Sequence, residues 1–229
     1  MVNAQALHNL GGNDQNQRWF MDFEDVPETL LHDTIIELLK LIFKHRFSDS
    51  SALVASNMAC RWDPNDARVG VDPDVILVMP APPEGDALKS LRVWQPDHRP
   101  PKVAIEVVSE TNADKDYIEG PARLAKLGAE ELWIFDPELH GPKHTGGPFV
   151  LQVWRRIGDQ MERVYAGSAP AYSPELEAWL VTTDDKRLRI ADDKRGINLW
   201  LTSYEAEKNR ADAAEAEIKR LRKLLAQKD

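Results

Sequence analysis

The stretch VAIEVV, residues 103–108, decides the fold of this chain. It is apolar except for Glu106 and rich in β-branched residues, which predicts a buried or half-buried strand. An ionised carboxylate in such a strand costs on the order of several kcal/mol unless something compensates its charge. A second strand-like run, residues 74–79, begins with Asp74 directly after Pro73. Two acids on two neighbouring apolar strands indicate a shared partner, and we expect that partner to be a divalent cation.

Side-chain alternation along these two strands determines where the acids point. Asp74 shares a strand face with Ile76, and Glu106 shares a strand face with Ala104. If the strands pair with the acids opposed, both carboxylates reach one cation. Mg²⁺ accepts one or two protein carboxylates together with waters and phosphate oxygens, which is what this pair supplies. The alternative interpretation is a structural network, in which a nearby Lys or Arg neutralises Glu106.

Length, composition and charge narrow the classes of protein. The 229 residues are 42% hydrophobic and 29% charged, which suits one α/β domain with a tail or two small domains. The net charge of −9 argues against a general phosphate-binding role, since such affinity comes from Lys and Arg. No apolar run is long enough to span a membrane, and we expect no membrane association. Cys60 is the only cysteine, which excludes an intramolecular disulfide and a cysteine zinc cluster and indicates a reducing cytoplasm.

Hydrophobic periodicity predicts an alternation of helices and strands. Residues 27–47 and 114–127 have helical spacing, the second with an interruption at Gly120-Pro121, and Gly128 is placed to end it. Residues 80–101 carry six prolines and form a loop. The expected strands are residues 53–61, 71–79, 102–109 and 131–135, a hairpin of 149–156 and 161–166, and short strands at 178–182 and 187–190.

The C-terminal segment differs in composition from the rest of the chain. Residues 204–228 contain no Gly or Pro and are rich in Ala, Glu, Lys, Arg and Leu, which predicts a helix. Its apolar positions alternate at steps of three and four, the spacing of a coiled-coil seam: Ala211, Ala214, Ile218, Leu221 and Leu225. Only about two heptads are visible. We therefore keep two interpretations, a homodimer through this helix and a solvated amphipathic helix packed on its own domain.

Three motifs in order resemble a known family. They are GVDPDV at residues 70–75, VAIEVVS at 103–109 and GAEELWIFDP at 128–137. Together they resemble the Uma2 family of restriction-endonuclease-like proteins, over roughly residues 27–140 and including His32. The resemblance implies a PD-(D/E)XK nuclease fold: an α/β restriction-endonuclease-like core with a mixed central sheet flanked by helices. We expect a flexible segment at 1–18, this nuclease domain at 19–202 and a C-terminal amphipathic helix at 203–229.

The resemblance also implies a set of site residues. Asp74 and Glu106 would hold Mg²⁺ or Mn²⁺, and the activity would be endonucleolytic cleavage of nucleic acid, DNA above all. The active-site lysine is where this chain departs from the pattern. A lysine two positions after Glu106 would complete the usual motif, but Val108 stands there. In Uma2-like sequences the lysine usually comes from the following helix, at the position that Gly120 occupies here.

Two interpretations follow from the displaced lysine. Lys115 is the closest basic residue to the strand end and is our first candidate for contacting phosphate, ahead of Lys126 and Arg123. The alternative is a catalytically impaired nuclease fold that serves as a binding or assembly module.

Four further residues are candidates for the site. Glu37 lies in the first predicted helix, where many nucleases of this fold carry an extra acid, but a solvated helix charge is the commoner case. His32 is expected to be a surface, capping or catalytic residue. His140 and His144 have the spacing of a helical metal pair, but Gly141-Pro142 lies between them, so we place them in a surface loop.

Overall fold

The central feature of the fold is a six-stranded mixed sheet in the order β1-β4-β6-β7-β8-β9. In this computed structural model, residues 29–66, 68–111, 113–168 and 170–227 are described, so the predicted segment 1–18 lies outside the description. The strands β6 and β7 are parallel, and the other neighbouring pairs of this sheet are antiparallel. The strands are β1 Leu53–Ser56, β4 Val75–Val78, β6 Val103–Val107, β7 Glu131–Phe135, β8 Leu151–Ile157 and β9 Gln160–Gly167.

Two three-stranded sheets complete the β-structure. One has the order β3-β2-β5 and the other β10-β11-β12. Their strands are β2 Cys60–Arg61, β3 Gly70–Val71, β5 Leu91–Arg92, β10 Ala171–Ser173, β11 Ala178–Thr182 and β12 Leu188–Ala191. The helices are α1 Leu30–Arg46, α2 Gly120–Leu127 and α3 Ser203–Leu225, with a π-helix, η4 Lys115–Glu119, directly before α2 and short 3-10 turns η3 Gly85–Ala87 and η5 Lys143–Thr145.

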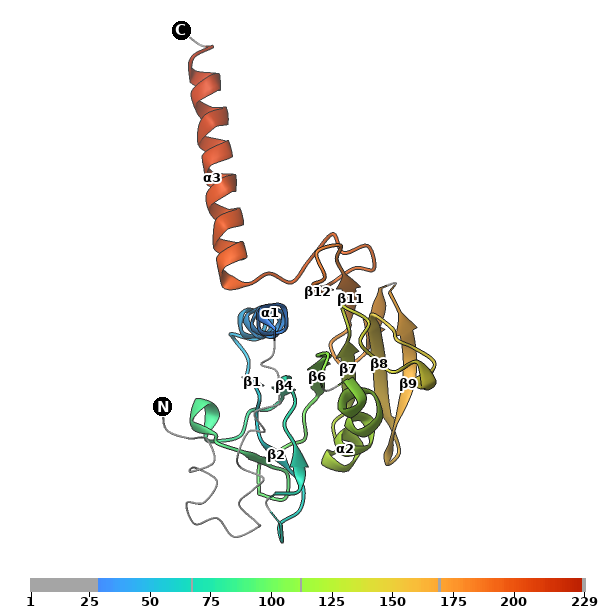
Figure 1. Cartoon of the computed structure of the whole chain (residues 1–229). Coiled ribbons are helices and arrows are strands. Elements are labelled where there is room, and N and C mark those ends of the chain that lie inside the picture. The colour runs from blue at the N-terminus through green and yellow to red at the C-terminus, as the bar shows by residue number, and fades with distance from the viewer. Residues whose placement is uncertain (1–28, 67, 112, 169, 228–229) are drawn as a thin grey trace, which may run out of the picture.

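A helix covers each face of the central sheet (Figure 1). Alternation in β6 sends Val103 and Ile105 into the core beneath α1, together with apolar residues of the β10-β11-β12 sheet. Ala104 lies in the second core, which α2 covers with Leu124 and other apolar side chains. The strands β4, β6 and β7 are buried on both faces, which explains their near-continuous hydrophobic character.

The structure confirms the predicted fold class and corrects several element boundaries. Residues 53–61 are not one strand: they divide into β1 and β2, which belong to different sheets, and residues 71–79 divide likewise into β3 and β4. The helix at 114–127 is not interrupted at Gly120-Pro121. A π-helical turn continues into α2, where the N–H of Gly120 bonds to the carbonyl of Lys115 and Pro121 occupies the first turn. The strands β5 and β10 were not predicted.

The third helix projects away from the rest of the structure (Figure 1). The predicted C-terminal helix is observed as α3, which is capped by Thr202 and contributes no buried residue. Among the residues that the structure describes, no helix has the length and apolar character needed to cross a membrane.

Candidate active site

Asp74 and Glu106 come from neighbouring antiparallel strands. The register of β4 and β6 pairs Val75 with Ile105, so one step further along the strands places Asp74 opposite Glu106. The Asp74 Oδ2 atom accepts a hydrogen bond of 2.6 Å from the backbone N–H of Val107. This bond holds the Asp74 side chain across the end of β6, beside the residue that follows Glu106. The sheet thus brings the two acids together.

Glu106 is completely buried. Its exposed fraction is 0%, and neither carboxylate oxygen has a hydrogen-bond partner among the residues that the structure describes. Burial and the nearby Asp74 carboxylate raise the pKa of Glu106 well above its usual range, while the Lys115 ammonium opposes this shift. A buried carboxyl group with two unpaired oxygens is costly, and groups of this kind are frequent at functional sites.

The π-helix η4 supplies a lysine and a third acid. Lys115 Nζ lies 3.7 Å from Asp116 Oδ1, and Asp116 is buried at 3% exposure. Burial alone would lower the pKa of Lys115, but the carboxylates of Glu106, Asp116 and Asp74 together raise it. Burial raises the pKa of Asp116 to about 7; the Lys115 ammonium opposes this rise and the Asp74 carboxylate adds to it. Lys115 is therefore held as a cation facing three acids.

His32 joins this group from α1. It is buried in the first turn of the helix, with Nε2 lying 2.8 Å from the carbonyl oxygen of Val107 and 3.4 Å from Asp74 Oδ2. Its backbone N–H bonds to the side chain of Thr29, which caps the helix. The surface or capping role that we considered for His32 is therefore wrong, because its ring packs against the end of β6 and the Asp74 carboxylate.

The remaining candidates make other contacts or are exposed. Arg123 pairs with Glu119 across an exposed turn, at 2.6 Å, and Lys126 is exposed on α2. Glu37 is exposed and pairs with Lys40, as expected for a solvated helix charge. The candidate loop histidines, residues 140 and 144, contribute to no metal-binding group among the described residues.

Asp116 is the site residue that sequence reasoning missed. It directly follows Lys115, and an acid beside the candidate lysine was the available signal. The role of Asp116 could not be predicted because a helix break was expected at Gly120-Pro121. With such a break, the direction in which the side chains of this segment point would be undefined. The π-helical turn instead directs both Lys115 and Asp116 toward the strand acids.

The donor set fits a hard divalent cation with few protein ligands. Within the described part of the chain, no group of three His, Cys, Asp or Glu side chains is arranged to hold a metal. Two carboxylates, one of them Glu106 with both oxygens unpaired, match the preference of Mg²⁺ for one or two carboxylates, with waters and phosphate oxygens as its other ligands. Asp74 and Glu106 are therefore the residues that would hold such an ion.

The mixed sheet, its flanking helices and the paired acids on adjacent strands agree with the restriction-endonuclease-like class that the sequence predicts. This chain belongs to the Uma2 family: the family model, described as "Putative restriction endonuclease", matches residues 23–141. A crystal structure of "a putative nuclease belonging to DUF820" from Anabaena variabilis ATCC 29413 is similar at 15% identity and a TM-score of 0.43. The similarity covers 65% of this chain and 76% of that one. No curated protein matches the chain.

Proposed function

We propose that this protein is a metal-dependent endonuclease that hydrolyses phosphodiester bonds of nucleic acid, with DNA as its substrate. Asp74 and Glu106 hold Mg²⁺ or Mn²⁺, and Lys115 contacts the scissile phosphate. Membership of the Uma2 family supports the reaction class. The reducing cytoplasm is the proposed location, and the buried free thiol of Cys60 is compatible with it.

The observation that carries this proposal is the complete burial of the Glu106 carboxylate without a hydrogen-bond partner in the part of the chain that the structure describes. The sheet buries this carboxylate completely, opposite Asp74 by strand register, and provides neither oxygen with a hydrogen-bond partner among the described residues. A cation bound by the two acids would offset their repulsion and the cost of burial. When bound, such an ion polarises a phosphoryl oxygen and lowers the pKa of a coordinated water.

Lys115 has the position and charge to act on the substrate. Its side chain is 38% exposed, so the ammonium is accessible to a phosphate arriving from solvent. The three acids keep it protonated, and its charge opposes the negative charge that builds up on the phosphate during hydrolysis. Asp116 contacts Lys115 and His32 contacts Asp74, so both act as positioning residues for the groups that touch the substrate or the ion.

The decisive experiment is a cleavage assay with the purified full chain. Single- and double-stranded DNA and RNA are incubated with Mn²⁺ or Mg²⁺, with EDTA as the metal-free control. The proposal requires metal-dependent cleavage that is lost in Asp74→Ala and in Glu106→Ala. Cleavage that is unchanged in both variants assigns the activity to a contaminant and removes the support for a nuclease.

Two features favour a second function, a catalytically impaired nuclease fold that binds or assembles without cutting. Gly120 stands at the position where Uma2-like sequences usually carry lysine, and the net charge of −9 does not favour phosphate binding. A protein freed from catalysis has no need for the costly Glu106 carboxylate, which is why we rank this function second. Mn²⁺ binding by calorimetry without cleavage of any substrate would establish it, and loss of cleavage in Lys115→Ala would exclude it.

A further inference from the structure

The helix α3 presents an apolar strip that the chain itself does not cover. Every described residue from Glu207 to Gln227 is exposed, including Ile218 at 49%, Leu221 at 47% and Leu225 at 66%. The helix points away from the domain, so no other element of the described chain packs along its length (Figure 1). Most of the stability of helices in proteins comes from packing of an apolar face, which α3 lacks within the described chain.

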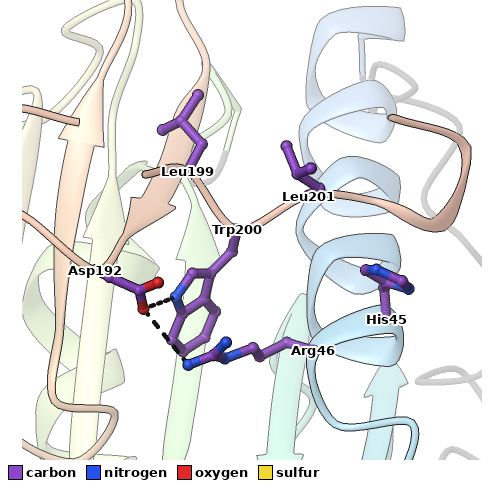
Figure 2. A pocket seen from close by; sticks show the side chains of 6 residues that line it. All are labelled: His45, Arg46, Asp192, Leu199, Trp200 and Leu201. Carbon is purple, nitrogen blue, oxygen red and sulfur yellow. Dashed lines mark hydrogen bonds and ion pairs between the residues drawn. The ribbon is translucent and has the colours of Figure 1, made fainter. Parts of the chain in front are cut away.

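The residues just before α3 are attached to the domain. Trp200, just before the helix, is 4% exposed; its Nε1 donates to Asp192 Oδ1 at 2.7 Å, and the Arg46 guanidinium stacks over its ring at 4.5 Å (Figure 2). The linker is thereby held between α1 and the segment that follows β12.

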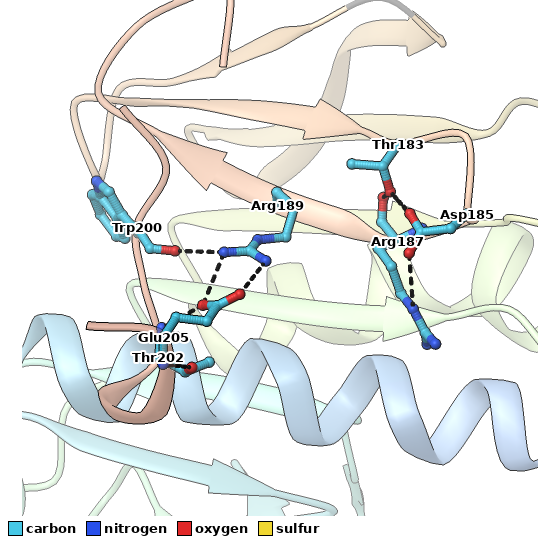
Figure 3. A network of polar contacts seen from close by, with 7 residues as sticks. All are labelled: Thr183, Asp185, Arg187, Arg189, Trp200, Thr202 and Glu205. Carbon is cyan, nitrogen blue, oxygen red and sulfur yellow. Dashed lines mark hydrogen bonds and ion pairs between the residues drawn. The ribbon is translucent and has the colours of Figure 1, made fainter. Parts of the chain in front are cut away.

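A second set of contacts orients the first turn of the helix (Figure 3). The Arg189 guanidinium of β12 donates to both carboxylate oxygens of Glu205, at 2.8 and 3.1 Å, and to the carbonyl oxygen of Trp200 at 3.0 Å. Glu205 and Thr202 form a capping box, in which each side chain accepts the backbone N–H of the other residue. The first turn is thus tied to the sheet, and the apolar strip beyond it remains in solvent.

The apolar strip has the residue pattern of a two-stranded coiled coil. Taking Ala211 as position a of a heptad places Ile218 and Leu225 at a, and Ala214 and Leu221 at d. A β-branched residue at a combined with leucine at d, as in Ile218 and Leu221, favours a parallel pair of helices over higher oligomers. The small alanines near the base allow close approach of two helices where each leaves its domain.

The charges beside the strip identify the partner. In a parallel, in-register pair, each g residue faces the e residue five positions later in the other helix. Arg210 at g would then face Glu215 at e, and Glu217 at g would face Arg222 at e. Both pairs are of opposite charge, and the symmetry of a dimer doubles them. The surface is therefore complementary to itself in this arrangement.

The contacts that these residues make in the single chain do not compete strongly. Arg210 pairs with Glu207, and Glu217 pairs with Arg220, within the same helix. Their side chains remain 51% to 76% exposed, and ion pairs at this i,i+3 spacing stabilise a helix by only about 0.2–0.5 kcal/mol. They can be exchanged for contacts between helices at little cost.

We propose that α3 binds α3 of a second copy of this chain as a parallel, in-register, two-stranded coiled coil. The dimer places the two domains at the same end of the coiled coil, each held by its own linker. The proposal does not depend on the nuclease function, because it rests on α3 alone.

Charge exchange between two full-length variants tests this arrangement. The g variant carries Arg210→Glu and Glu217→Lys. The e variant carries Glu215→Arg and Arg222→Glu. Both variants keep the net charge of the wild type. Each places like charges opposite each other in its own dimer, so we expect dimerisation to weaken by at least about tenfold. In an equimolar mixture the reversed faces are complementary again, and a heterodimer should form.

The measurement is the mass in solution by light scattering at tens of micromolar, where the wild type should approach twice the 25.9 kDa of one chain. The control is Asp212→Lys with Lys219→Glu, which exchanges charges at two outward b positions and should stay dimeric. A monomeric wild type overturns the proposal. The proposal is also overturned if both the g variant and the e variant remain dimeric. It is overturned as well if the equimolar mixture of the two variants remains monomeric. Circular dichroism of each variant separates loss of association from loss of folding.

Discussion

The Asp74 carboxylate is bonded to the backbone N–H of Val107 at 2.6 Å, across two strands whose residues are 33 positions apart in the chain. This bond fixes the side chain of the first acid beside the backbone of the second, Glu106. Two carboxylates would otherwise move apart to reduce their repulsion. The site is thus preorganised by the sheet rather than by a flexible loop, which is the arrangement that efficient metal catalysis requires.

Replacing Glu106 with Gln should abolish metal binding and cleavage while it stabilises the metal-free protein. The change removes a ligand and the repulsion with Asp74, and it keeps the shape of the side chain. The loss in Mn²⁺ affinity should exceed the roughly 10- to 100-fold that loss of an outer-shell partner costs at metal sites. Calorimetry with Mn²⁺ and thermal unfolding in EDTA measure both effects. Glu37→Gln, at an exposed position, is the matched control and should change neither.

Replacing Lys115 with Ala should lower the cleavage rate by about 10²- to 10³-fold, the usual cost of losing one group that stabilises transition-state charge. Mn²⁺ affinity should be kept or increased, because the lysine competes with a cation for the same acids. Single-turnover cleavage and calorimetry separate the two quantities. Lys126→Ala, in the exposed part of α2, should cleave at the wild-type rate. Equal losses in both variants would show that Lys115 acts through bulk charge alone.

A lysine at position 120 should partly restore the activity that Lys115→Ala loses. A Cβ atom on Gly120 would meet only the Lys115 carbonyl oxygen, at an ordinary contact distance of 3.6 Å, and the backbone there is helical. The π-helical turn places residues 115 and 120 on one side of the segment. The double variant Lys115→Ala with Gly120→Lys is therefore expected to cleave faster than Lys115→Ala, in the same assay. Gly120→Gln in the same background is the uncharged control.

The strand pattern was sufficient to predict that Asp74 and Glu106 lie on neighbouring strands, and alternation predicted which residues share a face with each acid. That the two acids lie opposite each other depends on the strand register, which only the structure gives. The local sequence pattern was not sufficient to predict that His32 is buried, because its burial depends on a contact with Val107, which lies 75 residues further along the chain. The local pattern also failed to predict the continuous helix at Gly120-Pro121. Glycine and proline usually break a helix, but here Pro121 lies in the first turn of α2, where its missing N–H costs nothing.

His32 should prove to be a positioning residue. Its ring contacts both the Val107 carbonyl at the end of β6 and the Asp74 carboxylate before β4, so His32→Ala removes both contacts. We expect the free energy of unfolding to fall by about 1–3 kcal/mol, as for loss of a buried hydrogen-bond partner, and Mn²⁺ affinity to fall with it. Denaturant unfolding and calorimetry provide the two readouts. A loss of stability with unchanged Mn²⁺ affinity would assign His32 a structural role only.

Glu131 should make the stability of the protein depend on pH. This carboxyl group begins β7, is 0% exposed and accepts a hydrogen bond from the Ser173 hydroxyl of the β10-β11-β12 sheet. Burial raises its pKa from 4.5 to about 7, and the Ser173 bond opposes the rise. Between these two values the folded protein keeps a proton that the unfolded chain has released. The free energy of unfolding must therefore fall as pH rises through this window and level off above it.

The variant Glu131→Gln isolates this effect, because an amide keeps an acceptor for Ser173 and cannot ionise. Near pH 4.5 the variant and the wild type should be similar in stability. Above pH 7 the variant should be more stable by on the order of 3 kcal/mol, from about 1.4 kcal/mol for each pKa unit. Urea unfolding of both proteins across this range gives the difference directly. Glu130→Gln, at the exposed neighbouring position, controls for the loss of one charge. A difference between wild type and Glu131→Gln that does not vary with pH would show that Glu131 remains ionised in the folded protein.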